Sequence, residues 1–163
     1  MKKLPTILAV LLFTTTIQAQ TVEVRNDRIL VDGNAIATIT RQGCRAASLD
    51  CTHFIRSSEG RTLITVIARD FVDPNQRTAG NPEGKVWYLR FSFADGRGVA
   101  EVADPSIRNI RPRDVARIIV SANLIEGDDL NEVEVQNFIQ AHGTHFSDRR
   151  QELNRDRQII IVR

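Results

Sequence analysis

The chain has 163 residues, of which 42% are hydrophobic, and its 22 basic residues nearly balance its 20 acidic ones. This length suits a single domain with a sizeable core. Nucleic-acid-binding domains usually carry a clear excess of basic residues, and this chain does not, so we expect no nucleic-acid partner.

The first residues have the layout of a secretory signal peptide. Lys2 and Lys3 precede a short apolar run at residues 6–13, and a polar stretch then leads to Ala19. The run is well short of the ~20 residues that span a bilayer. We predict cleavage after Ala19, although a helix buried in the mature domain is the alternative. Cleavage leaves 144 residues, 20–163, with 20 basic and 20 acidic residues. They form one secreted or periplasmic domain without a membrane span.

The N-terminal half of this domain is predicted to be a run of short strands. Asn26-Asp27 and Asp32-Gly33 are turn pairs, and the second is a strong signal for a two-residue hairpin. Strands this closely spaced leave no room for the crossovers that parallel pairing needs. The sheet therefore begins antiparallel, with strands expected at residues 22–25, 28–31, 35–40, 53–57 and 62–68.

The segment 86–93 has the clearest alternation of the chain. Period-two alternation of large apolar residues predicts a half-buried strand. We expect its apolar face to be the floor of the core, and residues 99–102 to pair with it as a hairpin. Residues 69–84, which contain Pro74 and Pro82, are predicted to form a long loop. The apolar face consists of Trp87, Leu89, Phe91 and Phe93.

Helical spacing begins after Pro105. Apolar residues in 113–123 recur at helical intervals. A second helix is predicted between Asn131, as its N-cap, and Gly143, as its stop. Helix 147–155 has one apolar residue and is expected to be solvated.

The final IIIV run at 159–162 must be paired or covered, and a last edge strand would achieve this. Strands followed by helices predict an α+β domain: an antiparallel meander with two or three C-terminal helices on one face.

Cys44 and Cys51 form the only cysteine pair, and an even cysteine count in an exported protein predicts a disulfide. Zinc is the alternative, since thiolates and the imidazoles of His53, His142 and His145 are suitable ligands. The spacing does not match a zinc motif, because no two cysteines are two to four residues apart. We therefore predict a disulfide and no metal.

Three further residue sets could carry chemistry, but each has a commoner structural interpretation. A nucleophile site would need a strained turn such as GxSxG, which the chain lacks. Aspartates before prolines and glycines are ordinary turn residues. An EF-hand needs a central Gly that is absent here. The three sets are Ser147, His145 and Asp148; the carboxylates Asp70, Asp73 and Asp95; and the calcium-like group Asp128, Asp129 and Asn131.

Arginines cluster around the start of the first predicted helix, and they could grip a phosphate or an acidic glycan. Asp104 and Asp114 dilute the cluster, so a solvated helix face is the plainer interpretation. The chain has no Gly-rich phosphate loop, and we expect no cofactor. The cluster consists of Arg108, Arg111, Arg113 and Arg117. The predicted partner surface consists of Asp73, Asn75, Arg77, Arg108, Arg111 and Arg113.

Five segments resemble the small secreted proteins of unassigned function from Bacteroidetes-type bacteria: VRNDRILVDGNAIATI, EGRTLITVIARD, WYLRFSF, ARIIVSANLIEG and VQNFIQAHG. The resemblance implies an exported small domain and carries no catalytic residue. We expect a non-enzymatic module that binds an unknown protein or envelope component, or has a structural role. A metal or anion binder and an enzyme of unrecognised type are the alternatives.

Overall fold

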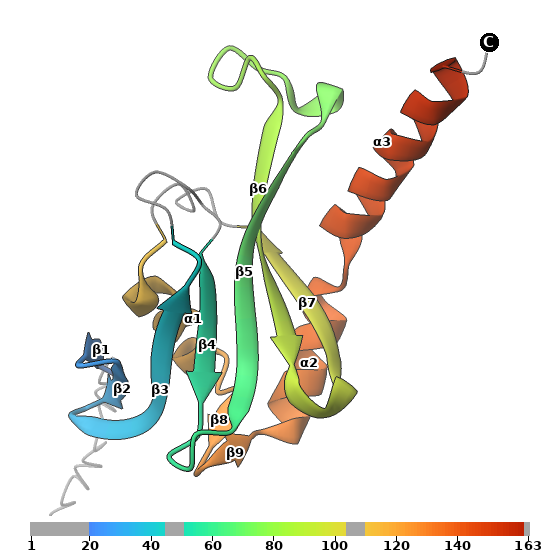
Figure 1. Cartoon of the computed structure of the whole chain (residues 1–163). Helices are drawn as coiled ribbons and strands as arrows, with labels where there is room; N and C mark the ends of the chain where they lie inside the picture. Colours follow the sequence, from blue (N-terminus) through green and yellow to red (C-terminus); the bar gives the residue numbers. More distant parts are fainter. Residues whose placement is uncertain (1–19, 45–50, 104–109, 162–163) are drawn as a thin grey trace, which may run out of the picture.

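The computed structural model describes residues 20–44, 51–103 and 110–161, so the predicted leader and Arg108 lie outside the described residues. The fold is α+β, as predicted. Its main sheet has seven antiparallel strands, and each strand pairs with its neighbours in sequence (Figure 1). The strands are β1 Val22–Arg25, β2 Arg28–Val31, β3 Asn34–Gln42, β4 Thr52–Arg56, β5 Thr62–Val72, β6 Lys85–Phe93 and β7 Gly98–Ala103.

Both predicted turn pairs join strands. Asn26 and Asp27 connect β1 to β2 with φ of 50° and 58°. Asp32 and Gly33 connect β2 to β3 with φ of 50° and 85°. Two successive positive φ values produce the primed turn that matches the twist of paired strands.

Three helices follow the sheet: α1 Pro112–Ser121, α2 Glu132–His142 and α3 His145–Ile161. As predicted, Asn131 caps α2 by accepting a hydrogen bond from the Glu134 N–H, and Gly143 ends it. A small hairpin of β8 Ile125–Glu126 and β9 Asp129–Leu130 joins α1 to α2 and was not predicted. Within the described ranges, no helix combines the length and apolarity needed to cross a bilayer.

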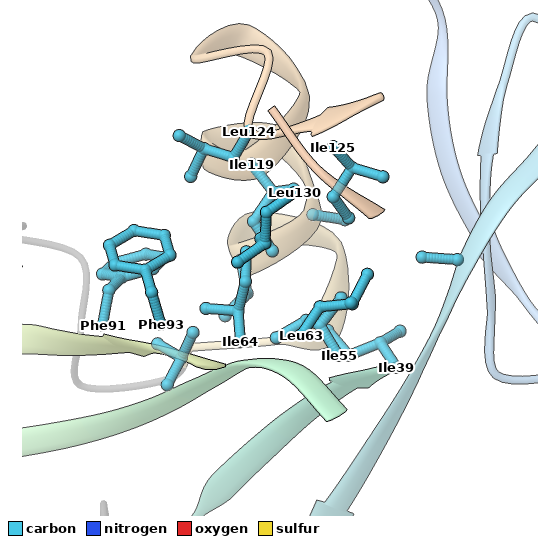
Figure 2. Packing of buried hydrophobic residues seen from close by; sticks show 14 of the residues in the cluster. Ile39, Ile55, Leu63, Ile64, Phe91, Phe93, Ile119, Leu124, Ile125 and Leu130 are labelled. Atoms are coloured by element: carbon cyan, nitrogen blue, oxygen red, sulfur yellow. The ribbon is translucent and has the colours of Figure 1, made fainter. Parts of the chain in front are cut away.

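The core lies between one face of the sheet and the helices α1 and α2, which Figure 1 shows behind the sheet. The prediction that the aromatic face of β6 is the floor of the core is confirmed. Phe138 of α2 lies 5.4 Å from Phe91 and 6.2 Å from Phe93, measured between ring centroids. A bulge in β5 turns the adjacent residues Leu63 and Ile64 into the same core (Figure 2).

The long loop expected at 69–84 is shorter than predicted. Residues Arg69–Val72 continue β5, and they pair with Lys85–Tyr88 of β6. A cross-strand ion pair stabilises this extension, since Lys85 of β6 pairs with Asp70 of β5 at 3.2 Å. Lys85 also lies over the ring of Trp87, on its own strand, at 4.1 Å. The loop proper is therefore residues 73–84, at the tip of the β5–β6 hairpin.

The last predicted element is wrong: residues 159–161 belong to α3 and do not form an edge strand. The edge strand β7 already has a neighbour, because the Glu101 N–H donates to the Gly143 carbonyl at 3.0 Å. Once α3 has begun, each added residue gains a backbone hydrogen bond without a new nucleation step. The helix therefore continues beyond the predicted end at residue 155.

Candidate functional site

A groove of about 640 Å³ lies between the edge strand β1 and the helix α1. It is larger than the groove of about 480 Å³ beside β3 and the groove of about 350 Å³ beside α3. Its lining residues are Gln20, Thr21, Val22, Arg113, Arg117, Val120 and Ser121. The charged side chains among these described lining residues are the two guanidinium groups of Arg113 and Arg117.

The amphipathic pattern of α1 explains why these arginines face the groove. Val115, Ala116 and Ile119 are fully buried in the core. Arg113 and Arg117, one turn apart, are then left on the exposed side of the helix. Pro112 and Asp114 fix the start of α1: Pro112 stands in its first turn, and the Asp114 carboxylate accepts from the Arg111 N–H at 3.0 Å.

The two groove arginines have no acidic partner among the described residues. A guanidinium offers several donors in a planar fork that matches a carboxylate or a phosphate. The lining residues include Thr21 and Ser121, which carry hydroxyl groups, and none of the lining side chains is a histidine, carboxylate or thiol; the Asp32 carboxylate nearby accepts a hydrogen bond from the Thr21 N–H at 2.9 Å. Such a lining can hold an anion.

The structure divides the predicted partner surface into separate places. Arg111 and Arg113 lie at the start of α1, whereas Asn75 and Arg77 are exposed at the tip of the β5–β6 hairpin. Arg117 was placed in the predicted arginine cluster but not in the predicted partner surface, and β1 was in neither. Helical spacing from Arg113 could have indicated Arg117, but no local signal places β1 beside α1.

Asp73, the remaining residue of that surface, has a structural role. Its buried carboxylate accepts two hydrogen bonds from the Arg149 guanidinium, at 2.9 and 3.2 Å, and one from the Asn75 N–H at 2.9 Å. These bonds hold the pKa of Asp73 below its ordinary value, with the Arg149 bonds the largest cause. Asp73 thus connects the hairpin tip to α3.

The predicted disulfide is confirmed: Cys44 and Cys51 are bonded, with their Cα atoms 4.4 Å apart. Neither cysteine can then supply the thiolate that zinc would need. His53 is fully buried, and no hydrogen-bond partner reaches either ring nitrogen within the described chain. Burial, with a smaller contribution from Arg41, lowers the pKa of His53 to about 4. No cluster of three or more metal-ligating side chains occurs among the described residues.

The residues of the hypothetical nucleophile site organise the start of α3. Both the N–H and the hydroxyl of Ser147 donate to the buried carboxylate of Glu101 on β7. His145 Nδ1 contacts the His142 carbonyl at 2.9 Å. The Asp148 carboxylate accepts from the Thr144 hydroxyl at 3.0 Å. These contacts cap a helix and do not align a nucleophile with a base.

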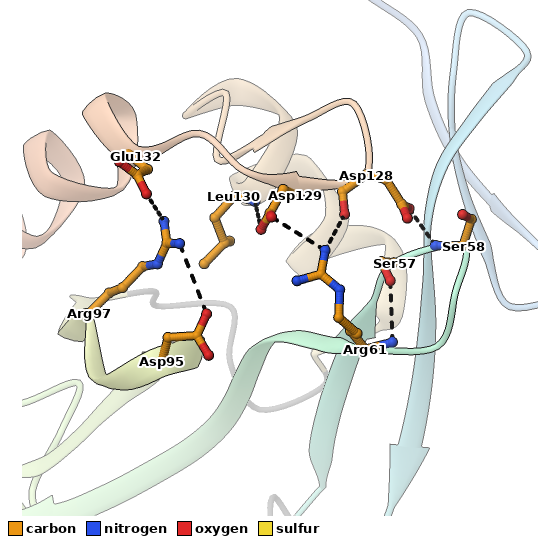
Figure 3. A network of polar contacts seen from close by, with 9 residues as sticks. All are labelled: Ser57, Ser58, Arg61, Asp95, Arg97, Asp128, Asp129, Leu130 and Glu132. Carbon is orange, nitrogen blue, oxygen red and sulfur yellow. Dashed lines mark hydrogen bonds and ion pairs between the residues drawn. The ribbon is translucent and has the colours of Figure 1, made fainter.

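The calcium-like aspartates hold the β8–β9 hairpin against the turn between β4 and β5 (Figure 3). Asp128 accepts from the Ser58 N–H at 2.5 Å, and Arg61 donates to the Asp129 carboxylate at 3.3 Å. The Leu130 N–H also donates to Asp129 at 2.8 Å, and this bond is the main reason that the pKa of Asp129 is lowered. One oxygen of Asp128 and both oxygens of Asp129 thus accept from protein donors.

No protein family, curated protein or solved structure shows significant similarity to this chain.

Proposed function

We propose that the protein is an exported, non-enzymatic module that captures an anionic partner in the groove between β1 and α1. The observation that carries the proposal is the pairing of Arg113 and Arg117 in a groove whose lining side chains include no carboxylate. Two like charges one helical turn apart repel each other slightly, and an anion between them relieves that repulsion. The disulfide is compatible with export, since such bonds persist in oxidising compartments.

A binding role fits the fate of the other titratable groups. Asp73, Asp129 and Ser147 are each occupied in holding two elements together. His53 is enclosed in the core. The groove arginines thus remain the polar groups best placed to meet a ligand.

The test uses the exported protein as purified, with its N-terminus checked by intact mass and expected at Gln20. Binding of fluorescein-labelled poly-L-glutamate is followed by anisotropy. The double variant Arg113→Gln/Arg117→Gln should weaken binding by roughly tenfold, because two charge-assisted contacts are lost. Raised ionic strength should also weaken binding of the unaltered protein.

The matched control is Arg150→Gln/Arg155→Gln, which removes the same charge from exposed positions on α3. It should bind poly-L-glutamate nearly as the unaltered protein does. Equal loss in both double variants would show that net charge alone attracts the polymer, and the groove would then not be the site.

A further inference from the structure

The outer edge of β1 carries backbone groups that have no neighbouring strand among the described residues. β1 is the first strand of the sheet and pairs only with β2 in the described chain. The two-residue turn Asn26-Asp27 places Arg25 of β1 opposite Arg28 of β2. At the other end of this hairpin, the Asp32 N–H donates to the Thr21 carbonyl at 3.0 Å.

In such a hairpin, hydrogen-bonded and non-hydrogen-bonded pairs alternate along the strand. Arg25, Glu23 and Thr21 therefore bond to β2, and the N–H and C=O groups of Val22 and Val24 point to the outer edge. Exposed groups of this kind can template an added strand.

We propose that β1 accepts an extended acidic peptide as an additional strand, with alternate acidic side chains directed at Arg113 and Arg117. This inference rests on the proposed function and names its partner. Main-chain bonds to an edge strand supply affinity in such complexes, while alternate side chains supply specificity.

The spacing of the two arginines supports an acidic residue at every second position. Four residues of an α-helix rise about 6 Å, and two residues of a strand rise about 6.6–6.8 Å. Val22 and Val24 are partly buried in the core that α1 covers, and α1 packs chiefly on β1. A strand beside β1 would therefore present every second side chain on the side where α1 lies.

Charge decides between this occupant and a second copy of the chain. Two copies joined edge to edge through β1 would bring their arginine pairs toward each other, and like charges close together disfavour the contact. An acidic strand gains from the same two groups. The partner is therefore an extended acidic segment of another protein.

The experiment measures the affinity of the exported protein for a labelled peptide of about nine residues with alternating Glu and Thr. Two methylated forms are compared, one N-methylated on the Glu amides and the other on the Thr amides. Only one set of amides can face β1, because strand groups alternate between edges. The peptide that is N-methylated on the amides facing β1 should bind at least about tenfold more weakly than the parent peptide. The affinity of the other methylated peptide should change by less than about twofold. The Arg113→Gln/Arg117→Gln variant should lose affinity for the parent peptide.

The outcomes separate the two proposals. Strand addition is wrong if the two methylated peptides bind as the parent does, or if both are weakened equally. If the arginine variant still loses affinity in that case, anion capture stands. If the arginine variant binds the peptide normally, the proposed function itself is wrong. If sedimentation experiments show a dimer that the peptide does not dissociate, a second copy of the chain occupies the outer edge of β1, and the inference is wrong.

Discussion

His53 is an unusual residue for the core of a small domain. Its ring is fully buried between its cross-strand neighbours Arg41 and Val66, and neither nitrogen has a hydrogen-bond partner within the described chain. Burial without compensating hydrogen bonds disfavours the charged form most strongly. The imidazole is therefore neutral in the folded protein at pH 7.

We predict that this histidine makes the fold sensitive to moderate acid. The pKa of His53 is about 4 in the folded state, against an ordinary 6.5. Between these two pH values the unfolded state therefore binds more protons than the folded state. The contribution of His53 to folding stability is complete above about pH 6.5 and is lost as the pH falls toward 4. Between pH 8 and pH 4.5, denaturant melts should show a loss of roughly 2.5 kcal/mol that His53→Leu removes.

The matched control for that prediction is His145→Leu, which replaces an exposed histidine. This variant should keep the acid sensitivity of the unaltered protein. If His53→Leu and the unaltered protein lose the same stability over this pH range, the acid-sensitive group lies elsewhere.

At the scale of elements, α3 depends on polar anchors. Few of its residues are apolar, and its attachment comes from Ser147 on Glu101, Arg149 on Asp73, and Phe146 stacked on Tyr88 at 5.1 Å between centroids. Glu101 is fully buried and accepts from both the N–H and the hydroxyl of Ser147. A carboxylate at a helix N-terminus is also favoured by the helix dipole.

Replacing Glu101 by Leu should detach the start of α3. The two Ser147 donors would lose their acceptor, at a cost of about 1–3 kcal/mol. Amide hydrogen exchange at Ser147 and in the next turn should accelerate, whereas exchange in α1 should stay unchanged. Glu126→Leu, on the exposed face of β8, is the control and should leave α3 protected. Unaltered exchange in Glu101→Leu would mean that Arg149 and Phe146 suffice.

Local sequence patterns predicted most elements because most boundaries here are set locally. Asp32-Gly33, Asn131 and Gly143 act through their own backbone conformation or caps, and all three behave as expected. The extension of β5 and the end of α3 were missed. The extension of β5 depends on a partner across the hairpin, the Lys85–Asp70 pair, and the continuation of α3 follows from the cooperativity of a helix that has already begun.

The candidate site was predicted only in part, for the same reason. Arg113 was visible as part of a basic cluster, but its importance comes from β1, which is about ninety residues earlier in the chain. Asp73 looked exposed because it precedes Pro74, yet Arg149 from the far end of the chain buries it. Tertiary contacts of this range leave no periodic signal in the sequence.

At the scale of the whole molecule, one continuous core supports both helices. Phe91 is fully buried at its centre, whereas Trp87 is partly exposed near the hairpin extension. Phe91→Ala should therefore lower the free energy of unfolding by about 3–5 kcal/mol. Trp87→Ala should cost clearly less in the same denaturant melts. Equal costs would mean that the core extends further along β6 than the contacts with Phe138 indicate.

The arrangement of the sheet has a consequence for the order in which the protein forms. Each strand from β2 to β7 lies beside the strand that precedes it in the sequence. A chain that emerges residue by residue can therefore add every new strand to an edge that already exists, without waiting for a later segment. Contacts of short sequence separation are also the fastest to form. The helices arrive last, so the growing edge stays open until α2 and α3 reach β7, and the order of synthesis itself can set the direction of folding.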